Sequence, residues 1–329
     1  MSDSEFLRMT DAERGFDAHD DATVKAAVVV QRGLRTRWQV YRLFGPDLFV
    51  DAAGRHRQSG SIAFEGVPRE ASWIKINEAT APHRLSEFMT HYWQLPRPEV
   101  LISVTGGAQD FELPPQLANA FERGLAKACI SAKAMIFTAG SDTGVMKLVA
   151  NAKQRHSIES PLIGVFPWGV VNGREQLAKN CGGVCGYKGS APSRDGAPLN
   201  PQHTHFIFVD DMKRGRKAWG SEIGLRSSLE SHISVAKSVP VVLLVVQGGP
   251  GTLATVLSAA YTAKPIVVLA DSGGAATALH DYMTKGPDAV EERFRSQVCG
   301  VNFTLRLAFE DALVACPCRF VRSCFHLSC

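Results

Sequence analysis

Six short apolar runs between residues 100 and 270 constrain the fold of this chain more than any other feature. They read VLISV (100–104), AMIFT (134–138), LIGVF (162–166), HFIFV (205–209), VPVVLLVV (239–246) and PIVVLA (265–270). Most are continuously apolar rather than alternating, which is typical of strands that are buried on both faces. We therefore expect six mostly parallel strands in one sheet.

Segments with helical spacing separate several of these runs. They cover residues 114–133, 141–156, 225–238 and 252–263, and Ser141 or Asp142 is the expected N-cap of the second one. Strands that alternate with helices predict an α/β fold with a Rossmann-like, doubly wound and mostly parallel sheet.

The turns that follow the six runs are rich in glycine and in acidic residues. They read TGGAQDF, AGSDTG, PWGV, VDDMKRG, QGGPGT and DSGGAA. Parallel strands place all of these turns at the carboxyl edge of the sheet, where open α/β sheets bind ligands. The glycine-rich turns at 106–107, 140–144 and 248–251 each precede a helical segment, and helix N-termini attract phosphate. This arrangement predicts a site for the phosphates of a nucleotide.

Two common nucleotide motifs do not match. GGPGT lacks the Lys-Ser/Thr pair of a Walker A loop, and no G-x-G-x-x-G opens the first strand–helix unit. We therefore do not expect hydride transfer with NAD.

Net charge and the distribution of apolar residues exclude further classes of protein. A net charge of +4 over 329 residues is too mild for a dedicated nucleic-acid binder. No apolar run reaches the roughly 18 residues that span a bilayer, and the N-terminus lacks the apolar core of a signal peptide. We expect a cytoplasmic chain that does not itself insert into a membrane.

No metal site is expected. Cys181 and Cys185 lack a second ligand pair at zinc-site spacing, and His203 and His205 alternate along a strand, so that they face opposite ways. Packing in the core or in a turn is the preferred interpretation of the two histidines.

Three regions are expected along the chain. Residues 1–35 are polar and predicted to be disordered, and residues 36–285 form the α/β domain, although 36–98 show a mixed pattern. Residues 286–329 are a helical or irregular tail, and four of the eight cysteines lie in its last fourteen residues.

The ordered motifs of residues 58–285 resemble a known family. They include LISVTGGAQDFELPPQLANAFERGLAKAC, TAGSDTGVMKLV, IGVFPWGVV, HTHFIFVDD, GSEIGLRSSLE and VVQGGPGTLATV. Together they are similar to the N-terminal SLOG domain, homology region 1/2, of melastatin-type transient receptor potential (TRPM) cation channels.

The resemblance implies a Rossmann-like core related to the nucleotide-processing LOG proteins. It implies a regulatory domain at the cytosolic face of a calcium-permeable channel, where some members bind ADP-ribose or a related nucleotide. Full-length relatives assemble as homotetramers, so subunits of the same family are the expected protein partners. The family's pore lies several hundred residues downstream, and we expect it to be absent from this chain.

The resemblance also implies a set of ligand-binding residues and no required cofactor. The set is Thr105, Gly106, Gly107, Ala108, Gly140, Ser141, Thr143, Gly144, Trp219, Arg226, Gly248, Gly249, Gly251 and Thr252. Arg226 matches an arginine that contacts ADP-ribose, and Trp219 stands where a ligand-stacking tyrosine occurs. A second ligand arginine of the family falls at Gly274, so weakened affinity for ADP-ribose is expected.

Two alternatives to nucleotide sensing stay open. One is a LOG-type nucleotide phosphoribohydrolase, whose relatives carry an acidic residue in a pattern like P-G-G-x-G-T-x-x-E. Here Leu253, Ala254 and Thr255 follow the threonine, which favours binding over catalysis. Carboxylates of other turns could replace the missing acid, namely Asp110, Asp142, Asp210 and Asp211. The other alternative is a ligand-free module that only builds contacts between subunits.

Overall fold

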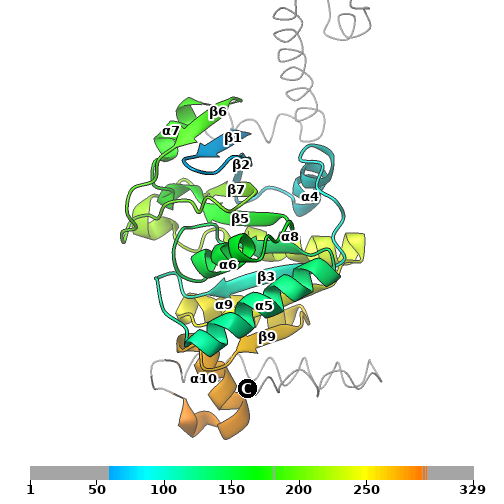
Figure 1. Ribbon diagram of the computed structural model, residues 1–329, viewed down its shortest axis with the longest axis vertical. Helices are drawn as coiled ribbons and strands as arrows, with labels where there is room; N and C mark the ends of the chain where they lie inside the picture. Colours follow the sequence, from blue (N-terminus) through cyan, green and yellow to red (C-terminus); the bar gives the residue numbers. More distant parts are fainter. Residues whose placement is uncertain (1–58, 181, 291, 293, 295–329) are drawn as a thin grey trace, which may run out of the picture.

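A computed structural model describes residues 59–294 except 181, 291 and 293, and in this part of the chain nine strands form one sheet (Figure 1). Their spatial order is β6-β1-β2-β7-β5-β4-β3-β8-β9. The strands are β1 (Ser59–Phe64), β2 (Glu70–Asn77), β3 (Leu101–Gly106), β4 (Met135–Thr138), β5 (Leu162–Pro167), β6 (Val184–Tyr187), β7 (His205–Asp210), β8 (Val241–Val246) and β9 (Ile266–Leu269).

The six predicted strands all form and occupy one continuous stretch of the sheet, from β7 through β5, β4, β3 and β8 to β9. Every neighbouring pair within this stretch is parallel, which confirms the prediction. The sequence did not predict β1, β2 and β6, which complete the other end of the sheet. The pair of β1 and β2 is antiparallel.

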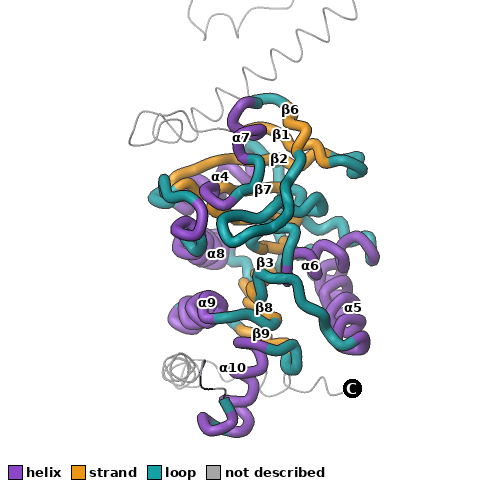
Figure 2. The backbone as a smooth tube through the Cα atoms, turned by 90° about the vertical axis from the view of Figure 1, so that its left-hand side faces the viewer, coloured by secondary structure: helices purple, strands orange, loops and turns teal. Residues whose placement is uncertain are grey.

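Helices cover both faces of the sheet, as a doubly wound fold requires. Figure 2 shows α5 and α6 on one side of the strands and α8 and α9 on the other. The helices are α4 (Pro82–His91), α5 (Pro115–Ser131), α6 (Gly144–Arg155), α7 (Arg174–Lys179), α8 (Ile223–Lys237), α9 (Pro250–Tyr261) and α10 (Gly274–Lys285), with short 3₁₀ turns at Trp168–Val170, Gly215–Ala218 and Pro287–Ala289.

The starts of α6 and α9 differ from the sequence prediction. The N-cap of α6 is Thr143, without a side-chain capping bond, because Ser141 Oγ is bonded to Thr143 Oγ1 and Asp142 accepts from Asn200. The helix predicted to begin at Thr252 begins at Pro250, whose fixed φ suits the first turn of a helix.

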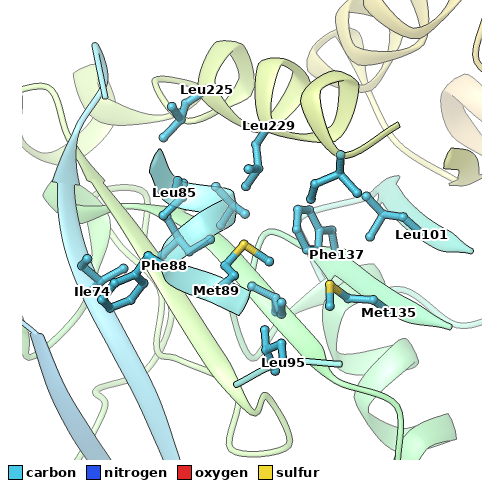
Figure 3. Packing of buried hydrophobic residues seen from close by; sticks show 14 of the residues in the cluster. Ile74, Leu85, Phe88, Met89, Leu95, Leu101, Met135, Phe137, Leu225 and Leu229 are labelled. Carbon is cyan, nitrogen blue, oxygen red and sulfur yellow. The ribbon is translucent and has the colours of Figure 1, made fainter. Parts of the chain in front are cut away.

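Separate apolar clusters fix the helices to the two faces. Leu85, Phe88 and Met89 of α4 and Leu225 and Leu229 of α8 pack against strand residues on one face (Figure 3). On the other face, α5 and α6 pack through a second cluster onto β3 and β4. Burial on both faces explains why the central strands are continuously apolar.

The boundaries at residues 35 and 285 stay predictions. The segment 1–35 and the cysteine-rich end of the chain lie outside the described residues.

Candidate functional site

The carboxyl ends of β3 and β8 form the topological switch point of the sheet. From β3 the chain continues to β4 on one side, whereas β8 and β9 lie on the other side. TGGAQ follows β3 and QGGPGT follows β8, and the strands pair in parallel with Gly106 opposite Val246. The two turns therefore lie at the same edge, as predicted, where open α/β sheets bind ligands.

Backbone contacts hold these turns together. Gly107 N donates to Val246 O at 3.2 Å, and Val145 N donates to Gly107 O at 2.9 Å. A Cβ at Gly106 would overlap Val246 O, and a Cβ at Gly144, where φ is +54°, would overlap Gly107 O. Packing between the turns thus requires these two glycines even without a ligand.

The turns after β3, β4 and β8 and the starts of α8, α9 and α10 line a cavity of about 750 Å³. A volume of this order is typical of small-molecule sites. We call it the glycine-turn cavity. Eleven of the fourteen predicted ligand residues line it, namely Thr105, Gly106, Gly107, Ala108, Ser141, Trp219, Arg226, Gly248, Gly249, Gly251 and Thr252.

Gly249 and Gly251 differ from the glycines that the turns require. A Cβ built on either residue would meet no atom within 4 Å. Neither has a positive φ. Packing within the described chain therefore does not explain why both are glycine.

Three predicted residues do not line the cavity. Gly140 packs against Gly164 and Phe206, and Gly144 N donates to Asp110 Oδ1 at 2.8 Å. Thr143 is bonded to Ser141. The second turn therefore reaches the cavity through Ser141 and Ala139.

Arg226 is a buried structural residue as well as part of the cavity wall. Its Nε donates to Glu230 Oε1 at 3.0 Å, and its Nη2 contacts Ser103 Oγ, Val104 O and Phe137 O at 2.8, 2.9 and 3.1 Å. The guanidinium thus joins α8 to β3 and β4. None of these bonds uses Nη1.

The positive charge of the cavity wall is already partly balanced. Lys264 Nζ lies 3.1 Å from Glu230 Oε2, so this carboxylate bridges Lys264 and Arg226. Burial raises the pKa of Glu230, but Arg226 and Lys264 outweigh burial and leave the pKa below its usual value. Arg226, Lys264 and Glu230 together therefore carry a net charge of +1.

Trp219 stands at the rim, 39% exposed. Its Nε1 donates to Arg194 O at 3.1 Å, and its ring meets Phe166 edge-on, with the centroids 5.8 Å apart. A ring held at its edge and partly exposed can stack on a planar ligand.

Sequence reasoning missed Glu222 and Lys264 among the polar residues of this wall. Glu222 precedes α8 and lines the cavity, and burial raises its pKa to about 7. The signal was present in GSEIGLRSSLE, where Glu222, Arg226 and Glu230 recur every four residues and so share one helix face.

Gly274 also lines the cavity, but it cannot simply be replaced by arginine. Its φ is +56°, and a Cβ there would overlap Gly248 O. Ala275 N donates to the same Gly248 O at 2.9 Å. An arginine at this position would therefore force the turns after β8 and β9 apart, because its Cβ has no room beside Gly248 O.

The carboxylates that could replace the hydrolytic acid lie elsewhere. Asp110 and Asp142 line a smaller cavity of about 390 Å³, while Asp210 pairs with Lys75 and Arg214, and Asp211 pairs with Lys213. In the glycine-turn cavity the position of the acid is held by Thr255, whose Oγ1 donates to Gly251 O at 3.2 Å.

The two histidines pack inside the fold. His203 Nε2 lies 2.7 Å from Thr138 Oγ1 and its Nδ1 3.3 Å from Asn200 Oδ1, and burial lowers its pKa to about 3. His205 lies against Trp93, and burial lowers its pKa to about 4. Within the described part of the chain, no three metal-ligating side chains come together.

Of the helices described here, none is both long enough and apolar enough to cross a bilayer.

Comparison with known proteins gives one consistent family. A family model described as SLOG in TRPM matches residues 71–309. The chain is 36% identical over 271 residues to transient receptor potential cation channel subfamily M member 1 of Mus musculus, covering 75% of this chain and 16% of the relative. It is 36% identical over 232 residues to subfamily M member 2 of Rattus norvegicus, covering 65% and 15%. It is 37% identical over 239 residues to subfamily M member-like 2 of Nematostella vectensis, covering 66% and 15%. The matched region is thus a small fraction of each relative's length.

Proposed function

This chain belongs to the family of SLOG domains found in TRPM cation channels, and from this premise we propose that it is a nucleotide-sensing regulatory module of such a channel. The proposed ligand is ADP-ribose or a related nucleotide. In a full-length, calcium-permeable channel the module lies at the cytosolic face of the membrane and contacts subunits of the same family.

The observation that carries this proposal is the convergence of helix starts on the glycine-turn cavity. The first residues of α8, α9 and α10 all line it. The first N–H groups of a helix have no acceptor within the helix, and the helix dipole adds partial positive charge there. At α10 the N–H groups of Ala275 and Ala276 already donate to Gly248 O and Gln247 O, so the starts of α8 and α9 are the ends that face a ligand. Helix starts that share one cavity favour a ligand with several anionic oxygens.

The glycines without a packing role support the same ligand. Gly249 and Gly251 leave open space beside the start of α9. A backbone without side chains at this point lets phosphate oxygens reach the N–H groups closely, which is the usual role of glycine in phosphate-binding turns.

We expect weak binding. Arg226 and Lys264 share Glu230, so little uncompensated charge faces a diphosphate, and the position of the family's second arginine is Gly274. An affinity of about 1 μM or weaker follows, since each missing charged partner costs roughly ten- to a hundredfold.

The test is calorimetric titration with ADP-ribose of the parent chain and of Gly251→Asp at fixed salt. Gly251 is in the first turn of α9 with space around it, so aspartate fits the backbone and its charge suits a helix start. Its carboxylate repels a diphosphate, and we predict at least tenfold weaker binding without loss of thermal stability.

Gly251→Ala is the matched control, because it adds a Cβ without a charge. We expect it to bind more weakly than the parent, because its Cβ takes space beside the N–H groups, but more tightly than Gly251→Asp, because it does not repel the phosphates. Equal affinity of the aspartate variant and the parent, or no binding to the folded parent, contradicts the proposal.

The enzymatic alternative is tested with AMP. Because Thr255 replaces the acid, we propose binding without turnover, so product analysis should find no free adenine. Steady release of base that is lost in Asp142→Asn or Asp210→Asn supports the hydrolase instead.

A further inference from the structure

Glu222 has a buried carboxylate oxygen that nothing in the fold explains. It is the N-cap residue of α8, but its side chain makes no capping hydrogen bond. Its Oε2 is buried and has no hydrogen-bond partner within the described residues, and the residue lines the glycine-turn cavity. A buried polar atom without a partner is costly and is therefore expected to have a function or a ligand.

Burial raises the pKa of Glu222 more than the backbone N–H groups of Glu222 and Gly220 and the charge of Arg226 lower it. Arg226 on α8 faces it, but that guanidinium already pairs with Glu230. Asp211, after β7, adds a second negative charge nearby. Lys264, another residue of the cavity wall, is also paired with Glu230. No cation of the cavity wall is therefore committed to Glu222.

We propose that Glu222 accepts hydrogen bonds from the ribose hydroxyls of a bound nucleotide and thereby selects ribonucleotides over deoxyribonucleotides. The inference rests on the proposed function, because it requires the phosphates to occupy the glycine turns. It adds Glu222 as the residue that contacts the ribose.

Donor chemistry favours a ribose diol over a phosphate at this position. An ionised carboxylate offers only acceptors, and a vicinal diol supplies two O–H donors for charge-assisted bonds. A phosphate offers acceptors and negative charge, so it is repelled by the ionised form. Folds that bind dinucleotides use an acidic residue on ribose hydroxyls in the same way.

Position agrees with this chemistry. Glu222 and Trp219 come from the segment that leads into α8, whereas the glycines that suit phosphate come from the turns after β3 and β8. A nucleotide with its phosphates at those turns places its nucleoside toward the remaining wall. Trp219 and Glu222 then face the base and the sugar, respectively.

The experiment compares ADP with 2′,3′-dideoxy-ADP by calorimetric titration at pH 8. The parent should bind ADP at least tenfold more tightly, because the analogue lacks both hydroxyls and the loss of even one hydrogen bond to a charged group costs about tenfold. In Glu222→Ala the two nucleotides should bind within twofold of each other. Glu175→Ala, which removes an exposed carboxylate of α7, is the matched control and should keep the parent's preference.

If Glu222→Ala does not fold, Glu222→Gln replaces it in the same titration, because glutamine keeps the shape of the side chain. Its neutral amide should reduce the preference at least threefold.

The pH dependence of binding is an independent readout, since Glu222 must be ionised to accept hydrogen bonds from both hydroxyls. With a pKa of about 7, ADP-ribose should bind roughly tenfold more weakly at pH 6 than at pH 8 in the parent, and equally in Glu222→Gln. The two diesterified phosphates of ADP-ribose keep their charge over this range.

The outcomes separate the two proposals. A preference for ADP that survives in both Glu222 variants, or a parent without any preference, overturns the role of Glu222 and leaves nucleotide binding standing. If neither ADP nor ADP-ribose binds the folded parent, both proposals fail together.

Discussion

The guanidinium of Arg226 is expected to contact the ligand and is also part of the structural core of the site. The family resemblance assigns it to the ligand, whereas the structure bonds it to Glu230, Ser103 and two backbone carbonyls. Nη1 takes no part in these bonds, so a ligand contact requires no rearrangement of the others. Loss of this residue therefore affects the fold as well as any ligand.

Arg226→Ala should lower the free energy of unfolding by about 3 kcal/mol, because the buried carbonyls of Val104 and Phe137 lose their donor and Glu230 loses one of its two cations. Urea unfolding measures the change. Lys285→Ala removes an exposed ion pair with Asp281 and should change the free energy of unfolding much less. Equal effects of the two substitutions would contradict the structural role of Arg226.

The sequence alone could place Arg226 near the ligand but could not show its bonds. Its acceptors lie at residues 103, 104 and 137, about 90 to 120 positions away, and only the folded sheet brings them together. Glu222 was predictable in principle from its spacing to Arg226. Its unpaired oxygen was not, because that depends on burial by other elements.

At the scale of elements, continuous apolar runs predicted the strands of the sheet centre, where both faces are covered. The strands that were missed have other patterns. β2 alternates between buried and partly exposed residues over part of its length, and β6 alternates fully because it lies at the edge of the sheet. β1 begins with Ser and Gly, which are weak strand formers.

The glycines of the turns give a prediction at this scale. Gly106→Ala places a Cβ against Val246 O at the end of the β3–β8 pair, so it should lower the free energy of unfolding by at least 2 kcal/mol. Gly124→Ala is the matched control, since it lies in α5 with nothing within 4 Å, and it should stabilise by about 0.5–1 kcal/mol. Urea unfolding of both variants measures the difference, and a neutral Gly106→Ala contradicts the close approach of the turns.

At the scale of the whole molecule, the strand order explains where the cavity lies. The chain starts the central region at β3, extends the sheet through β4, β5 and β7, and then returns to the other side of β3 with β8 and β9. The helices therefore lie on opposite faces (Figure 2). The turns after β3 and β8 line the glycine-turn cavity at the edge between them. The same order could be anticipated only as a class of fold, because apolar runs do not reveal which strands are neighbours.

The membership in the TRPM family and the position of this cavity lead to one central claim, that a nucleotide binds where the glycine turns meet. Hydrogen exchange followed by mass spectrometry, with and without saturating ADP-ribose, tests it directly. Nucleotide binding at the glycine turns predicts slower exchange in peptides that cover residues 105–109, 219–227 and 247–253, and unchanged exchange over 188–199, which border the smaller cavity. Protection confined to 188–199, or no change in the three glycine-turn peptides at saturating ligand, would contradict it.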